Sequence, residues 1–152
     1  MFKERGCDVY RIREVDPFLD EDALEAIHYF NRQTCLFPAL DEDTLARGWW
    51  WLAYRGDEAV GFAGLTQTYN DPKIGYFKRA GIDPKHRGHG LQSRLIRVRI
   101  AKCRKLGLTH VITDTTDTVY SANNLYKAGF KMFNPTKPWM KYKTSLYWIK
   151  QL

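Results

Sequence analysis

The chain of 152 residues contains no apolar run that approaches the roughly 18 residues of a membrane-spanning helix. Residues 1–6 also contain no apolar core of the kind found in secretion signals. These two absences predict that the protein does not insert into a membrane. We therefore expect it to be cytoplasmic.

Cysteine is scarce, with three residues in all, Cys7, Cys35 and Cys103. An odd number of widely separated cysteines does not fit a disulfide framework, and their spacing does not match that of known metal ligand sets. We expect free thiols in a reducing compartment and no bound metal.

Repeats, low-complexity tracts and linkers are also missing, which predicts a single domain over residues 1–152 with a core at about residues 9–149. Hydrophobic residues make up 44% of the chain, enough for a folded core. The formal net charge is +7. This charge favours anionic ligands, acidic protein surfaces or nucleic acid as partners, and it says nothing about the fold.

Hydrophobic periodicity and turn residues predict a mixed α/β fold with a central sheet. Strands are expected over residues 9–15, 49–54, 59–68, 74–82, 109–114, 130–133 and 145–149. Helices are expected from residue 20 or 22 to 33, and over residues 41–47, 91–106 and 119–128. Because a helix connects strands 74–82 and 109–114, these two strands should run parallel. Gly81 suggests a bulge or a close backbone approach within its strand.

Three consecutive tryptophans open the second predicted strand. Side chains alternate between the two faces of a strand, so Trp49 and Trp51 should share one face and Trp50 should take the other. Because large aromatic side chains on a sheet usually pack in a core, we predict a structural role for all three.

A glycine-rich turn, Arg87-Gly88-His89-Gly90-Leu91-Gln92, precedes the long predicted helix. Backbone N–H groups at a helix N-terminus have no partner within the helix and bind phosphate well. The turn lacks the Walker A pattern, and Ser93 occupies the place of the third glycine of a dinucleotide fingerprint. A phosphate-bearing cofactor is the favoured ligand, and a nucleic-acid-binding loop stays open.

A second motif lies downstream, where Leu125, Tyr126, Gly129 and Phe130 form a Leu-Tyr-x-x-x-Gly-Phe pattern. Together with the glycine turn, and with the hairpin of residues 51–65, it resembles the GNAT superfamily of N-acetyltransferases. The resemblance spans about residues 9–149. It implies a mostly antiparallel central sheet of six to seven strands flanked by about four helices.

The resemblance implies acetyl-CoA as the cofactor and a primary amine as the acceptor, with direct attack and no metal. The backbone of residues 80–82 would pair with the pantetheine arm, and the glycine turn would hold the pyrophosphate. The implied cofactor-binding residues are Ala80, Gly81, Ile82, Lys85, Arg87, Gly88, His89, Gly90, Leu91, Gln92, Ser93, Asn123 and Tyr126.

The resemblance also implies catalytic roles. A backbone N–H near Ala80 would stabilise the oxyanion of the thioester, and Tyr126 would act as general acid toward the thiolate. Asp114 is a candidate base, although a capping role fits it as well. Asp71 and His110 are weaker candidates.

The acceptor groove of the family lies between the first helices and the C-terminal strands. Residues 36–38, Tyr76 and Phe77 are its expected walls. The basic segment 137–143, with Trp139 and Tyr142, either contacts an acidic acceptor or forms a solvated loop.

Two residues depart from the family pattern. Gln92 stands where the family has a small residue, and Val119 stands where many members have an asparagine. Asn123 or Ser121 would then hold the pantetheine arm.

The partner is expected to be a small-molecule or protein amine, and a homodimer is possible because dimers are common in the family. Two alternatives stay open. One is an RNA-linked amine, suggested by the net charge and by Arg94, Arg97 and Arg104. The other is an acyl-CoA-binding module without catalytic activity.

Overall fold

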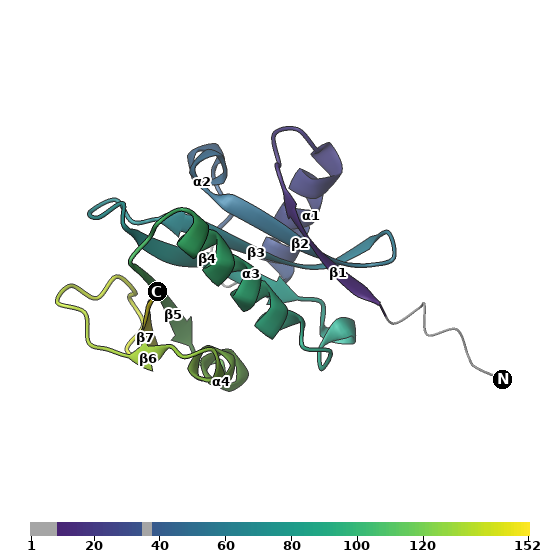
Figure 1. The fold of residues 1–152 in the computed structure, drawn as a ribbon. Coiled ribbons are helices and arrows are strands. Elements are labelled where there is room, and N and C mark those ends of the chain that lie inside the picture. Colours follow the sequence, from purple (N-terminus) through teal and green to yellow (C-terminus); the bar gives the residue numbers. More distant parts are fainter. Residues whose placement is uncertain (1–8, 35–37) are drawn as a thin grey trace.

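The computed structural model describes residues 9–34 and 38–152 (Figure 1). Its strands are β1 (Tyr10–Val15), β2 (Trp49–Arg55), β3 (Glu58–Gln67), β4 (Ile74–Ile82), β5 (His110–Thr116), β6 (Lys131–Met132) and β7 (Ser145–Gln151). Its α-helices are α1 (Glu21–Thr34), α2 (Glu42–Arg47), α3 (Leu91–Lys105) and α4 (Val119–Lys127). A short 3-10 helix, η2 (Pro84–His86), connects β4 to the glycine turn.

The strands form one seven-stranded sheet in the order β1-β2-β3-β4-β5-β7-β6. Every neighbouring pair is antiparallel except β4 and β5, which run parallel. This arrangement confirms the predicted fold class and the parallel pair around α3. Within the described residues, none of the helices has the length and apolarity needed to cross a membrane.

Helices cover both faces of the sheet (Figure 1). On one face, α1 and α2 pack on a core that includes the fully buried Trp50 and Phe62. On the other face, α3 and α4 pack on a larger core that includes Trp51, with Trp49 at its margin. The predicted split of the three tryptophans between the two faces is therefore confirmed, as is their core role.

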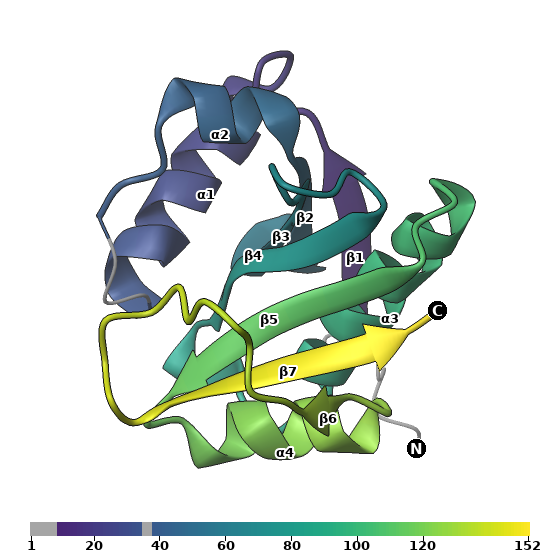
Figure 2. The ribbon, with the colours of Figure 1, turned by 90° about the vertical axis from the view of Figure 1, so that its left-hand side faces the viewer.

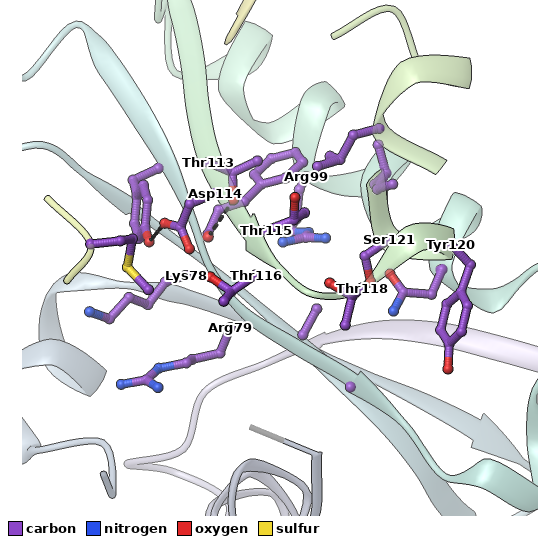
Figure 3. Close-up of a pocket in the computed structure, with 18 of the residues that line it drawn as sticks. Lys78, Arg79, Arg99, Thr113, Asp114, Thr115, Thr116, Thr118, Tyr120 and Ser121 are labelled. Carbon is purple, nitrogen blue, oxygen red and sulfur yellow. Dashed lines mark hydrogen bonds between the residues drawn. The ribbon is translucent and has the colours of Figure 1, made fainter. Parts of the chain in front are cut away.

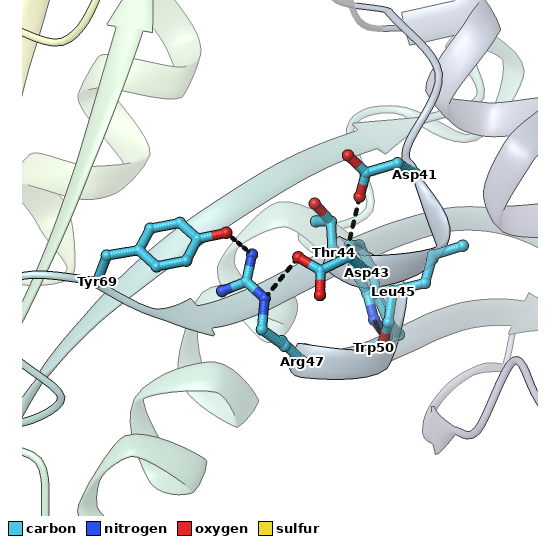
Figure 4. A network of polar contacts seen from close by, with 7 residues as sticks. All are labelled: Asp41, Asp43, Thr44, Leu45, Arg47, Trp50 and Tyr69. Carbon is cyan, nitrogen blue, oxygen red and sulfur yellow. Dashed lines mark hydrogen bonds and ion pairs between the residues drawn. The ribbon is translucent and has the colours of Figure 1, made fainter.

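Short polar contacts fix α2 against the sheet (Figure 4). Asp41 is the N-cap of α2, and its carboxylate accepts a hydrogen bond of 2.7 Å from the Thr44 N–H. The Trp50 indole donates to the Leu45 carbonyl at 3.0 Å, which satisfies a polar group inside the core. The first bond caps α2, and the second ties α2 to β2 and orients the Trp50 ring.

A bulge interrupts the pairing of β3 and β4. Ala63 pairs with Ala80 and Gly64 pairs with Lys78, so Arg79 is the extra residue. Arg79 has a φ of 56°, an unusual value for a residue with a side chain. The sequence suggested an irregularity at Gly81, and the bulge lies two residues earlier because the change in register occurs opposite Gly64.

Of the three cysteines, Cys103 lies within the described residues. Cys103 is a free thiol buried under the sheet, and burial raises its pKa to about 11. Cys7 and Cys35 lie outside the described residues. Within the described residues, His, Cys, Asp and Glu side chains form no cluster of three or more that could hold a metal ion.

Because Gly64 has no side chain, Trp50 can lie against the bulge. A Cβ atom at Gly64 would lie 2.3 Å from Trp50 Cζ3 and 2.6 Å from the Lys78 carbonyl oxygen. Because the ring and the backbone cannot both retreat, we expect Gly64→Ala to lower the free energy of unfolding by about 2 kcal/mol or more. Urea denaturation measures this loss.

Gly75→Ala is the matched control, because its Cβ would meet side-chain ends at 3.1–3.3 Å. We expect it to lower the free energy of unfolding by about 1 kcal/mol or less. Equal losses in the two variants would contradict the role given to Gly64.

Candidate functional site

The candidate site lies where β4 and β5 separate (Figure 2). The two strands pair only at their first residues, in the register Ile74↔His110, Gly75↔Val111 and Tyr76↔Ile112. At the point of separation, the Thr113 hydroxyl donates to the Phe77 carbonyl at 3.2 Å. Beyond this bond, β4 continues to Ile82 and β5 to Thr116 without pairing to each other. A wedge therefore opens inside an otherwise continuous sheet.

A cavity of about 460 Å³ occupies this wedge (Figure 3). The separated halves of β4 and β5 form two of its walls, and α3, the start of α4 and residues 139–142 complete it. Arg87 and Gln92 line the end next to the glycine turn, whereas Tyr76 and Trp139 line the other end. The cavity thus connects the glycine turn with the face of the sheet that lies opposite α3.

The glycine turn has the geometry expected of an anion site. Gly88 has a φ of 82° and Gly90 a φ of 74°, values that favour glycine, and a Cβ at either position would meet no atom within 4 Å. Gly90 is the N-cap of the 15-residue α3 and has no side chain to bond the first amides of the helix. Arg87 lies beside the turn, and its Nη1 donates to the Tyr120 hydroxyl at 3.1 Å. The turn therefore combines helix N-terminal amides with a positioned cation.

The predicted cofactor residues divide into three groups. Those that line the cavity are Ala80, Gly81, Ile82, Arg87 and Gln92. Those that are exposed around the turn are Lys85, Gly88, His89 and Gly90, while Ser93 is half-buried and the Leu91 side chain is in the core. On α4, Asn123 is exposed outside the cavity lining, whereas Ser121 lines the cavity.

Tyr126, the predicted general acid, lies on α4 next to Leu125. The Leu125 side chain is buried and lines the cavity. Tyr126 is 72% exposed and is not among the lining residues. The chain by itself therefore does not bring the Tyr126 hydroxyl together with Ala80 and Asp114, and the general-acid role stays a prediction.

Asp114, the predicted base, lies in an aromatic enclosure at the opposite end from the turn. Its Oδ2 accepts hydrogen bonds from the Tyr76 hydroxyl and, at 2.8 Å, from the Trp139 indole. Trp139 packs edge-on against Tyr147, with ring centroids 4.6 Å apart. Burial, followed by the neighbouring Asp114 charge, raises the pKa of Tyr76 well above its usual value. Tyr76 therefore stays protonated and donates to Asp114 across the physiological pH range.

The other predicted acceptor and base residues differ in whether they line the cavity. Tyr76 and Phe77 both line the cavity, although Phe77 belongs to the core on the α3 face. Leu36 and Phe37 lie outside the described residues. Asp71 bonds the Lys73 N–H within a loop, and His110 contacts Thr109, so both lie outside the cavity lining.

Arg99 is a cavity residue that sequence reasoning missed. Its side chain is 3% exposed and stacks on Phe77, with Cζ 3.9 Å from the ring centroid. Nη1 donates to the Gly64 carbonyl at 3.3 Å, beside the bulge. Burial lowers the pKa of Arg99 to about 9. Its spacing of four residues from both Leu95 and Cys103, which are buried on the same helix, was the available signal.

A family model described as the acetyltransferase (GNAT) family matches residues 8–130. The matched span covers most of the chain and contains both the glycine turn and α4.

Among curated proteins, N-acetyltransferase family 8 member 2 of Rattus norvegicus is 31% identical over 90 residues. The aligned part is 57% of this chain and 40% of that protein, so the chain spans less than half the length of this relative.

Solved structures share the whole fold at low sequence identity. An IAA acetyltransferase from Bacillus cereus has a TM-score of 0.74 at 15% identity, over 95% of this chain and 100% of that chain. A Bacillus subtilis acetyltransferase in complex with CoA has a TM-score of 0.75 at 16% identity, over 95% of this chain and 99% of that chain. These likenesses show a common arrangement of helices and strands.

The buried charge of Arg99 should affect the stability of the protein, and two substitutions separate the effect of the charge from that of the side-chain shape. Arg99→Met removes the charge from the apolar layer, whereas Arg99→Lys keeps a charge and loses the planar stacking and the hydrogen-bond fork. At pH 7 we expect Arg99→Lys to be less stable to urea than Arg99→Met by about 1–2 kcal/mol.

The difference between these variants should shrink as the pH rises. A buried lysine has a lower pKa in the folded than in the unfolded state, so the unfolded chain binds more protons and stability increases with pH. A difference that stays constant between pH 7 and pH 10 would show that the loss does not arise from buried charge.

Proposed function

The chain belongs to the GNAT acetyltransferase family, and we propose that it transfers an acetyl group from acetyl-CoA to a primary amine bound in the same cavity. The observation that carries this proposal is the wedge between β4 and β5, which has the glycine turn at its open end. One end of the wedge suits a long anionic cofactor, and the other offers a carboxylate and an aromatic wall to an acceptor.

In the proposed complex, the pyrophosphate binds at the N-terminus of α3. Amides from residues 88–93 donate to it, and Arg87, Lys85 and His89 contribute positive charge or donors nearby. The pantetheine arm enters the wedge and lies along the backbone of residues 80–82 in the manner of an added strand. The half-buried Ser121 is available to its amides, because it lines the same wedge.

The proposed reaction is a direct displacement. The amine nitrogen attacks the thioester carbon, the new C–N bond forms, and the C–S bond breaks. A backbone N–H at Ala80 stabilises the oxyanion, and Tyr126 donates a proton to the departing thiolate. A lysine-like amine is neutral about once in 10³ molecules at pH 7, so its proton must be accepted, by Asp114 directly or through water. No covalent enzyme intermediate and no metal take part in this scheme.

We favour a small-molecule or protein amine over an RNA-linked one. Of the three arginines that suggest an RNA surface, Arg94 donates to the Tyr10 carbonyl at 2.9 Å and is half-buried. This contact removes Arg94 from a continuous exposed stripe with Arg97 and Arg104.

Cofactor binding provides the direct test. We expect acetyl-CoA at about 100 times its dissociation constant to stabilise the protein by about 2.7 kcal/mol, seen as a rise in melting temperature. Arg87→Ala should weaken binding about tenfold by removing a charge-assisted contact to phosphate. Arg97→Ala is the control, because Arg97 is exposed on α3 outside the cavity lining. No thermal shift with wild-type protein would overturn the cofactor assignment.

The general acid is tested by paired tyrosine variants. Tyr126→Phe should lower kcat by about 10²-fold and leave the affinity for acetyl-CoA within about threefold, because general-acid catalysis acts in the transition state. Tyr120→Phe should instead weaken acetyl-CoA binding, because the Tyr120 hydroxyl positions Arg87. Unchanged kcat in Tyr126→Phe would remove Tyr126 from this role. Tight cofactor binding without turnover of any amine would indicate an acyl-CoA-binding module.

A further inference from the structure

The acceptor end of the cavity carries positive charge, which is unexpected for an enzyme that binds an amine. Lys78 is half-buried and lines the cavity on the face of the sheet opposite α3. Burial lowers the pKa of Lys78, and the charge of Arg79 lowers it further. An amine acceptor arrives mostly as an ammonium ion, and two adjacent cations repel it. A simple alkylamine is therefore a poor match for this wall.

The positive charge of Lys78 is not neutralised by a direct ion pair. In the described part of the chain, no carboxylate lies within ion-pair distance of Lys78 Nζ. Asp41 is close enough to influence Lys78, but its carboxylate caps α2 through Thr44 (Figure 4). Arg47, a further cation that acts on Lys78, is bonded to Asp43 at 2.9 Å.

A negative charge, that of Asp114, lies at the same end of the cavity. Lys78 Nζ is 5.9 Å from the centroid of the Tyr76 ring, and the hydroxyl of that ring donates to Asp114. A cation thus lies over the face of a tyrosine ring whose hydroxyl is bonded to an anion. Figure 3 shows Lys78 and Arg79 extending to one side of the cavity, away from Ser121 and Tyr120. Lys78 and Asp114 are therefore at the acceptor end rather than at the cofactor end.

We propose that the acceptor is a small amine that carries an anionic group at its opposite end. Its amine faces Asp114, and its anionic group faces Lys78. This inference rests on the proposed function, because it assigns the substrate class of the same cavity. The acceptor is small because about 460 Å³ must hold both the acceptor and the end of the cofactor. Trp139 and Met140 form the wall for its apolar middle.

Pairs of acceptors that differ in one anionic group test the proposal. The initial rate of CoA release is measured with 4-aminobutyrate and butylamine, and with O-phosphoethanolamine and ethanolamine. We expect at least one member with an anionic group to exceed its partner without that group in kcat/KM by about tenfold, the effect of roughly one well-placed charge contact. Preference within the first pair identifies a carboxylate, and preference within the second identifies a phosphate. Partners without the anionic group that react equally well or better in both pairs would overturn the proposal.

Variants at Lys78 show whether this side chain causes the preference. Lys78→Met should lower the ratio of the two kcat/KM values about tenfold, whereas Lys78→Arg should retain the ratio. Lys73→Met is the control, because Lys73 is an exposed lysine outside the cavity lining. A ratio that Lys78→Met leaves unchanged would contradict the proposal.

A binding measurement separates this inference from the proposed function. The melting temperature of the CoA-bound protein is recorded with each acceptor that carries an anionic group and with its partner that lacks the group. A rise with an anionic compound that depends on Lys78 supports the proposal even when no amine is acetylated, a result that would overturn the proposed function alone. Turnover or stabilisation that is equal for the two members of each pair would overturn the inference while the proposed function stands.

Discussion

The separation of β4 and β5 is the constraint on which the site depends. Parallel strands in a sheet normally stay paired, because separation leaves backbone donors and acceptors without ladder partners. Here the separation is held by three side-chain and backbone features, namely the Thr113–Phe77 bond, the bulge at Arg79 and the guanidinium of Arg99 beneath Gly64. An extended ligand that enters the wedge would complete a structure that the protein leaves open.

Because the wedge passes through the sheet, its two ends have different chemistry. The α3 side offers helix amides and Arg87 at the glycine turn, and these groups suit phosphate. The opposite side offers Asp114 with its aromatic enclosure, and a cationic wall at Lys78. In the proposed reaction, the acceptor amine therefore reaches the thioester carbon from the side opposite to the one where the pyrophosphate of the cofactor binds. This arrangement would allow direct transfer without a covalent intermediate.

Sequence signals predicted the parts of the fold that local patterns encode. Residues 74–82 were predicted as a strand with the bounds that β4 has, and the three tryptophans divided between the faces as their alternation required. Gly81 suggested a bulge or a close backbone approach because glycine is the usual signal, whereas the position of the bulge at Arg79 depends on the register of β4 with β3. Arg99 was not predicted to be buried, since an arginine in a basic helix normally faces solvent. The bond from Trp139 to Asp114 joins residues that no periodicity relates.

Asp114 and Tyr126, two of the proposed catalytic groups, differ in how completely the chain positions them. Asp114 is held by two donors, and its environment is formed before any ligand binds. Tyr126 is largely exposed, and its hydroxyl has no hydrogen-bond partner within the described residues. General acids without bound substrate often lack their final geometry, because the reacting complex supplies the missing contacts. In the proposed mechanism, the acceptor half of the site is therefore built by the protein. The donor half is completed by the cofactor, which must cover the exposed side of α4 before Tyr126 can reach the sulfur.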